Sequence, residues 1–163
     1  MRTRAFIVPL TAALALAGAA SAQPSSVNVT ISPDFEQEAA KLGQRDVEQQ
    51  VARLASTVER TLAARNALDG AVINLTITDL KPNRPTMQQA ADKPGLDPIR
   101  SMSLGGASIE GTVTTPSGEV QPVKYTYYST SIYDVIGLDT WSDAEGAYQG
   151  LARNLANGRF VSR

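Results

Sequence analysis

The sequence predicts an α+β domain in which about four strands form a mixed sheet, with the helices packed on one of its faces. Two alternating runs flank a long amphipathic segment, two more flank a turn, and the last part of the chain has a helical period. The expected order of elements is therefore β-α-β, a long loop and then β-β-α.

The first half of the domain has the pattern of strand, helix and strand. Apolar and polar residues alternate over 27–31 and again over 73–77. Between these runs, apolar residues recur every three or four positions, which predicts a helix from about Asp46 to Leu68. A helical crossover of this length implies that the two strands are parallel. A shorter helix is expected between Ser32-Pro33 and Gly43.

The next strand shows a change of frame. Its apolar residues fall on even positions at Met102 and Leu104 but on odd positions at Ile109 and Val113. We therefore expect a β-bulge at Gly105-Gly106, where the frame changes.

A turn at 116–118 leads into the last predicted strand, in which Val123, Tyr125 and Tyr127 alternate with other residues. Pro122 has no N–H to donate, so it predicts an edge position or an irregularity there.

The chain closes with a second amphipathic helix. Ser142 and Glu145 have the spacing of a capping box, and Asn157-Gly158 supplies a stop. Trp141 is expected to bury its ring under the first turn. The patterns predict one shared core, made of Val51, Leu54, Val58, Leu75, Ile77, Ile109, Tyr125, Leu151 and Leu155.

Residues 1–22 have the three parts of a secretory signal peptide. Arg2 and Arg4 precede an apolar stretch, and Ala20-Ser21-Ala22 forms a small-residue cleavage site. The alternative is a membrane anchor, but the apolar stretch is short for the roughly 20 residues that a spanning helix needs. We expect cleavage after Ala22, a single domain over 23–163, no integral membrane segment after cleavage, and a periplasmic or secreted location.

Composition excludes several kinds of chemistry. The chain has no cysteine and no histidine, so disulfides, thiolate metal sites, thiol nucleophiles and Ser-His pairs are all impossible. The formal net charge is −1, and the signal would remove two arginines and no acid. Nothing in this balance favours nucleic acid as a partner. No cofactor, metal site or catalytic residue is indicated.

The long connection between the third and fourth predicted elements is the most distinctive segment. Pro82, Pro85, Pro94 and Pro98 restrict the backbone, so residues 81–100 lose less entropy on ordering than a Gly/Ser linker would. A short helix is expected from Thr86 to Asp92, with Thr86 as its cap and Gln89 three residues on. Its inward anchors would be Met87, Ala90 or Ala91, Leu96 and Ile99.

This loop and the strand before it contain the candidate binding residues. Asp79 ends an apolar run at the carboxyl end of a strand, where α/β sheets often bind ligands. It has an alternative role in capping the turn or pairing with Arg84. Arg84 is the expected anchor for a carboxylate group. The alternative is a simple lid over a sheet edge or the end of the core, which is favoured because most loop residues pack or solvate and do not bind. The binding candidates are Asp79, Asn83, Arg84, Gln88 and Gln89.

The segments "INLTITDL", "KPNRPT", "SLGGASIEG" and "TWSDAEGAYQGLARNLA" resemble small exported envelope proteins of Gram-negative bacteria whose function is unknown. The resemblance covers most of residues 27–158 and implies an envelope location, but it assigns no role to any residue.

Two functions stay open. The first is a non-catalytic protein that binds a protein, a peptide or an envelope component through the 81–100 loop or a sheet edge. The second is a small carboxylate-dependent hydrolase, for which a pair of close acids would be required. The absence of a strong nucleophile and base favours the first.

Overall fold

The computed structural model describes residues 23–162, so the predicted signal peptide lies outside the described residues. The strands form a single mixed sheet in the order β1-β2-β3-β4-β5. The elements, in chain order, are β1 (Ser26–Ile31), the 3₁₀ helix η1 (Pro33–Phe35), α1 (Glu36–Leu42), α2 (Gln44–Arg65), β2 (Val72–Lys81), α3 (Met87–Asp92), β3 (Gly106–Thr114), β4 (Val120–Tyr128), the 3₁₀ helix η2 (Ile132–Val135), α4 (Ser142–Ala156) and β5 (Val161–Ser162).

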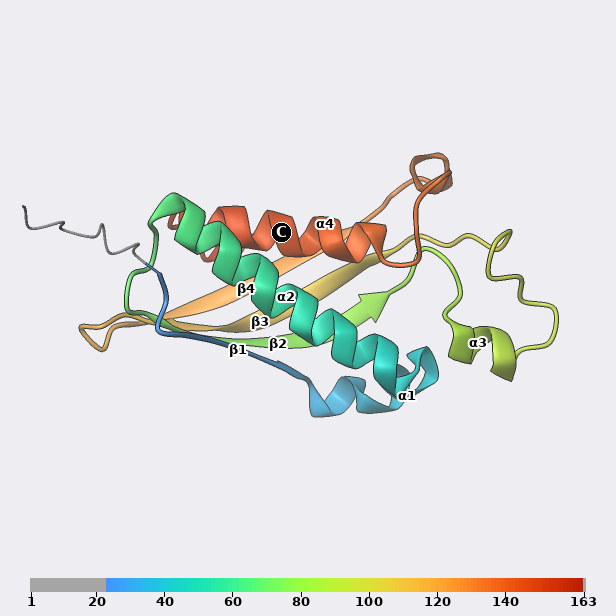
Figure 1. Ribbon diagram of the computed structural model, residues 1–163, viewed down its shortest axis with the longest axis horizontal. Coiled ribbons are helices and arrows are strands. Elements are labelled where there is room, and N and C mark those ends of the chain that lie inside the picture. The colour runs from blue at the N-terminus through green and yellow to red at the C-terminus, as the bar shows by residue number, and fades with distance from the viewer. Residues whose placement is uncertain (1–22, 163) are drawn as a thin grey trace, which may run out of the picture.

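The sheet confirms the predicted α+β class (Figure 1). β1 and β2 are parallel, as a helical crossover requires, and β2, β3 and β4 are antiparallel neighbours. The fifth strand, β5, pairs in parallel with β4 through two residues only. A strand this short has no alternation that a sequence pattern can reveal.

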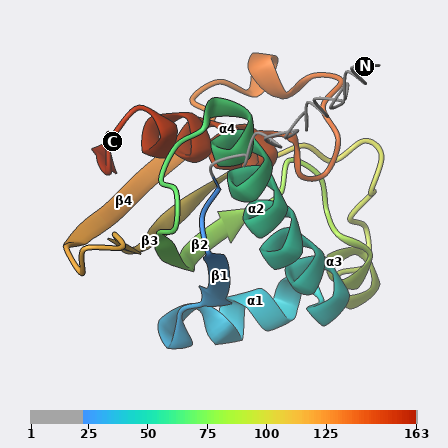
Figure 2. The same cartoon turned by 60° about the vertical axis from the view of Figure 1, so that its left-hand side comes forward.

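Helices α2 and α4 lie side by side on one face of the sheet (Figures 1 and 2). Alternate side chains of β2 and β3 point into this layer, so the core lies between the sheet and the two helices. Most of the predicted core is confirmed as buried, whereas Val51 and Tyr125 are half-buried at its margin. The confirmed residues are Leu54, Val58, Leu75, Ile77, Ile109, Leu151 and Leu155.

The other face of the sheet is polar and carries cross-strand pairs. The Asn28 amide donates to Asn74 at 2.9 Å, and the Lys124 ammonium lies 2.6 Å from Glu110. The Ser108 and Thr126 hydroxyls lie 2.9 Å apart on the same face. These polar pairs take the place of a second helical layer.

A β-bulge occurs in this sheet, but not at the predicted position. Ile77 pairs with Ile109 and Asp79 pairs with Ser108, so Thr78 is the extra residue. The prediction at Gly105-Gly106 is wrong because β3 begins at Gly106, and Met102 lies in the preceding loop. Thr78 shifts the frame of β2, so Leu80 points into the core and Asp79 turns to the polar face.

The helix boundaries also differ from the predictions. α2 ends at Arg65, because Asn66 adopts a left-handed conformation (φ 49°) before the expected Asp69-Gly70. The predicted capping box of α4 is wrong, since the Ser142 hydroxyl accepts the N–H of Asp139. The Glu145 carboxylate instead binds Arg53 of α2 at 2.6 Å. Trp141 is buried as predicted.

Tyr148 of α4 provides a test of the core. Its side chain is 0 % exposed and its hydroxyl has no hydrogen-bond partner among the described residues. A buried polar group without a partner destabilises a fold by about 1–3 kcal/mol. We therefore expect Tyr148→Phe to leave the free energy of unfolding unchanged or to raise it, as measured by urea titration at pH 7. A clear loss of stability would show that the hydroxyl has a partner.

The same variant should change the response to alkali. Burial raises the pKa of the Tyr148 hydroxyl. Above the ordinary tyrosine pKa of about 10, the unfolded chain releases this proton while the folded chain retains it, so stability falls as the pH rises. Below that pH both states are protonated and this group makes no pH-dependent contribution. Tyr148→Phe should therefore lose less stability than the wild type between pH 9 and about 11.

No helix among residues 23–162 is both long and apolar enough to cross a membrane.

Candidate functional site

The segment between β2 and β3 is held in place by one buried asparagine. Asn83 is 0 % exposed, and its backbone N–H donates to Thr140 O at 2.7 Å. Its carbonyl accepts the N–H of Ser103 at 2.9 Å, at the far end of the same loop. Both ends of the loop are thereby fixed to each other and to the segment before α4.

The Asn83 side chain reaches a buried carboxylate in the first turn of α4. Its Nδ2 donates to Asp143 Oδ2, while its Oδ1 accepts the Asp143 N–H at 2.9 Å. The Ser129 hydroxyl, just after β4, donates to the same carboxylate. Gly105 is required beside this contact, because a Cβ there would lie 2.6 Å from the Asn83 amide. We call Asn83, Ser103, Ser129, Thr140 and Asp143 the Asn83 network.

Arg84 also fastens the loop. Its Nε donates to Leu138 O at 2.6 Å, and its Nη1 donates to Ile99 O. Because the guanidinium donates to two backbone carbonyls, it joins the tip of the loop to the segment between β4 and α4. These contacts favour a structural role for Arg84, and its predicted role as a carboxylate anchor stays untested.

The short helix in the loop forms as predicted. The Thr86 hydroxyl accepts the Gln89 N–H at 3.2 Å, and the Gln89 side chain accepts the Thr86 N–H at 3.1 Å. The predicted inward anchors Met87 and Ile99 are wrong, since they are 75 % and 79 % exposed. The Asn83 network and Arg84 hold the loop, so apolar anchors at those positions are not needed.

Farther along the loop, Asp97 closes a tight turn. Its Oδ1 accepts the N–H groups of Ile99 and Arg100 at 2.8 and 3.0 Å. These backbone hydrogen bonds lower the pKa of the Asp97 carboxyl. Local hydrogen bonds of this kind order the part of the loop that has no regular structure.

The ordered loop borders a groove with two lobes. The first lobe has a volume of about 600 Å³ and lies between α1, the end of β2 and α3. The second has a volume of about 390 Å³ and lies between α3 and residues 101–104. The wall shared by both lobes consists of Lys81, Pro82, Gln89 and Lys93. We call this two-lobed hollow the loop groove.

The lobes differ in chemistry. The first carries charged side chains of both signs, including Glu38, Lys41 and Asp92. The second is lined mainly by proline and apolar side chains, among them Pro85, Leu96, Met102 and Leu104. The loop groove therefore presents a charged compartment beside an apolar one.

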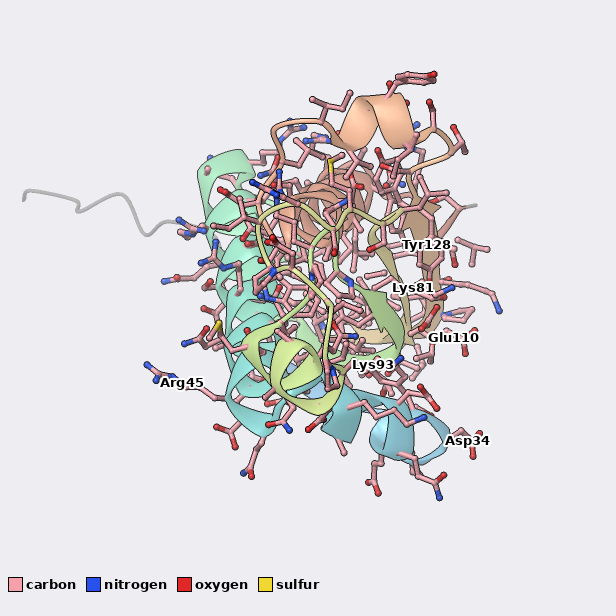
Figure 3. All side chains as sticks on the ribbon, turned by 90° about the vertical axis from the view of Figure 1, so that its right-hand side faces the viewer. Asp34, Arg45, Lys81, Lys93, Glu110 and Tyr128 are labelled. Carbon is pink, nitrogen blue, oxygen red and sulfur yellow. The ribbon has the colours of Figure 1, made fainter. Side chains whose placement is uncertain are left out.

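Asp79 lies at the rim of the first lobe, in a small polar cluster. The Tyr128 hydroxyl donates to Asp79 Oδ2 at 2.7 Å, and Lys81 Nζ lies 3.4 Å from the same oxygen. Lys81 Nζ is also 5.0 Å from the centre of the Tyr128 ring, within range of a cation–π contact. Burial, then the hydrogen bond to Asp79, raises the pKa of Tyr128. Figure 3 shows Lys81, Lys93 and Tyr128 from this end of the molecule.

The structure brings two of the five predicted binding residues together. Asp79 and Gln89 both line the first lobe. Asn83 lies in the interior, and Arg84 binds backbone carbonyls behind the loop. Gln88 lines neither lobe; it lies against the start of α2, and its amide donates to Asp92 at 2.9 Å. Binding by any of these residues stays a prediction.

Sequence reasoning missed Lys81, Lys93, Tyr128 and Asp143. Lys81 contacts Tyr128 because the bulge at Thr78 shifts the frame of β2, and it shares the groove wall with Lys93 because α3 folds back beside α1. Asp143 has one local signal, its place in the first turn of a predicted helix, where a carboxylate is favoured.

The carboxylates Asp79, Asp92 and Glu38 of the loop groove are each bonded to a cation or to a hydrogen-bond donor. Asp79 binds Tyr128 and Lys81, Asp92 accepts from Gln88, and Glu38 pairs with Lys41. Within residues 23–162, no group of three or more acidic side chains is placed to hold a metal ion.

A search of protein-family descriptions and of curated proteins found nothing that matches this chain.

Proposed function

We propose that this chain is a non-catalytic, exported protein that binds an anionic peptide or polymer segment of the cell envelope in the loop groove. The observation that supports it is an ordered, two-lobed groove with Lys81 and Lys93 on the wall between the lobes. Lys93 has no ion-pair partner within the described part of the chain. Its ammonium group is thus free to meet a carboxylate or phosphate on a ligand.

The two lobes favour a ligand with two kinds of group. An apolar side chain would fill the second lobe beside Leu96 and Met102, while an acidic group would lie against the two lysines. Because the Asn83 network holds the loop already ordered, little conformational entropy remains to be lost on binding.

The hydrolase alternative gains no support from the geometry. Each groove carboxylate is bonded to a hydrogen-bond donor or a cation, and hydrolysis by two carboxylates requires both of them to face one bond.

Cross-linking within the groove tests the proposed function. A photo-reactive amino acid at Met102, in the second lobe, is introduced into the protein in its native host. We expect discrete cross-linked products that disappear when Lys81→Glu and Lys93→Glu are combined. The matched control is Lys124→Glu on the polar face of the sheet, outside the groove.

The proposal fails if the products persist in the double lysine variant, or if illumination gives no product in the wild type. Loss of the products in the Lys124→Glu control would show a general charge effect and would equally contradict it.

Export is tested separately by mass. If residues 1–22 are a cleaved signal peptide, the protein purified from its native host should begin at Gln23 and be recovered from the periplasm or the medium. Intact-mass spectrometry checks this directly. A species that retains Met1 and sediments with membranes would contradict the proposed location.

A further inference from the structure

The outer edge of β1 is free of strand partners among the described residues. β1 is the first strand of the sheet, and only β2 pairs with it. The Ser32 N–H, directly after β1, donates to Ile77 O, and alternate residues of a strand hydrogen-bond on the same side. The N–H groups of Asn28 and Thr30 therefore point toward β2, whereas those of Val27 and Val29 point outward.

This edge lacks the sequence features that usually prevent an edge strand from pairing with another chain. Ser26–Ile31 contains no proline, no charged residue and no bulge. The opposite edge of the sheet has several of them. There, β5 covers Lys124 and Tyr125, the Lys124 N–H donates to Phe160 O, and Pro122 turns its ring nitrogen outward by the same alternation. One edge is protected and the other is open.

An apolar strip runs along the open edge on the helical side. Val27, Val29 and Ile31 of β1 and Val51 of α2 are only half-buried against the core. At the Ile31 end, a hollow of about 370 Å³ opens between α1 and α2, lined by Ala39, Ala40 and Val47 among others. An additional strand would place alternate side chains over this strip and complete its burial.

The flank above the open edge is acidic. Glu36 of α1 and Glu48 of α2 line the hollow. Glu59 lies eleven residues after Glu48, which is three helical turns farther along the same face of α2. Both side chains are exposed. Asn28 and Thr30, on the other face of the strand, are uncharged. A segment added here would thus meet negative charge on its helical side only.

We infer that the open edge of β1 is a second binding site, which takes an extended segment of another protein with apolar residues in its middle and Lys or Arg at its ends. Backbone hydrogen bonds to Val27 and Val29 would provide affinity, and the glutamates would select basic ends. This site lies at the opposite edge of the sheet from β5. Its hollow shares no lining residue with the loop groove.

A second copy of this chain fits the edge less well. Two β1 strands paired antiparallel about a two-fold axis would place the start of one α2 beside the end of the other. Glu48 of one copy would then face Glu59 of the other, and like charges in an interface oppose association. The charges of Glu48 and Glu59 therefore favour a basic segment over self-pairing.

The test uses a labelled synthetic peptide, Lys-Thr-Val-Thr-Val-Thr-Lys, whose valines and lysines share one face when it is extended. Fluorescence anisotropy measures its binding to the domain over 23–163, and the same peptide with Glu in place of both Lys is the control. We expect the Lys peptide to bind about tenfold more tightly than the Glu peptide at low salt. The combined variant Glu48→Lys and Glu59→Lys should abolish that preference, whereas Glu119→Lys in the exposed β3–β4 turn should retain it.

A backbone variant tests strand addition itself. Val29→Pro removes an outward N–H without touching the bonds to β2, and edge positions tolerate proline. It should keep the cooperative melt and lose the peptide. Should it fail to fold, the charge-reversal pair above still decides the matter.

Three results would overturn the inference: no binding of the Lys peptide, equal binding of both peptides, or a loss of binding in Lys81→Glu with Lys93→Glu, which would move the peptide to the loop groove. A concentration-dependent dimer that Val29→Pro abolishes, seen by analytical ultracentrifugation, would assign the edge to a second copy instead. Failure of the groove cross-link would leave the edge site unaffected, since the lysine variants do not touch β1.

Discussion

Leu151→Ala should lower the free energy of unfolding by about 2–5 kcal/mol. Leu151 is 1 % exposed and lies on the face of α4 that packs against the sheet and α2. Truncation removes buried apolar contacts and leaves a cavity that rigid neighbours cannot close. Urea titration gives the loss directly, and thermal melts should show the same order of variants.

The matched control is Arg153→Ala on the exposed side of the same helix. This change should alter stability by less than about 0.5 kcal/mol. Equal losses for the two variants would mean that α4 turns a different face to the core.

Asn83→Ala should be the most damaging change in the long loop. It leaves the buried Asp143 carboxylate with fewer donors and frees the Asp143 N–H. Because the group left behind is a buried charge, we expect a loss of about 3 kcal/mol or more. Asn74→Ala, which removes an exposed cross-strand hydrogen bond, is the matched control and should have a far smaller effect.

The Asn83 network also predicts how the effects combine. If Asn83 and Asp143 act on each other, Asn83→Ala together with Asp143→Ala should cost clearly less than the sum of the single losses. Simple addition would show that the two residues stabilise the fold independently.

Limited proteolysis of Asn83→Ala should also cut within residues 84–104, where the wild type resists.

Local periodicity accounts for most of the regular structure. The apolar stripe of α2 and the alternation in β2 arise within single elements, so the amino-acid order alone specifies which face is buried. The bulge at Thr78 is different. It depends on how β2 pairs with Ser108 and Ile109 of β3, and its one sign in the sequence is the shift of the apolar residues from odd positions up to Ile77 to an even position at Leu80.

In the loop, too, the sequence predicts the contacts between neighbouring residues but not those between distant ones. Thr86 and Gln89 form a cap because their spacing is local, and this was predictable. The burial of Asn83 was not, since its amide partners Ser103 and Asp143 are 20 and 60 residues away. Prolines correctly indicated an ordered segment, but which of its polar residues turn inward is decided by these distant contacts.

The proposed function requires that the loop groove is already formed in the free protein. Amide hydrogen exchange measures this most directly. The N–H groups of Asn83, Lys93 and Ser103 are bonded to Thr140, Gln89 and Asn83. They should exchange at least about a hundredfold more slowly than unprotected amides, and Asn83→Ala should remove that protection. Exchange of these amides at the unprotected rate in the wild type would contradict a prebuilt groove.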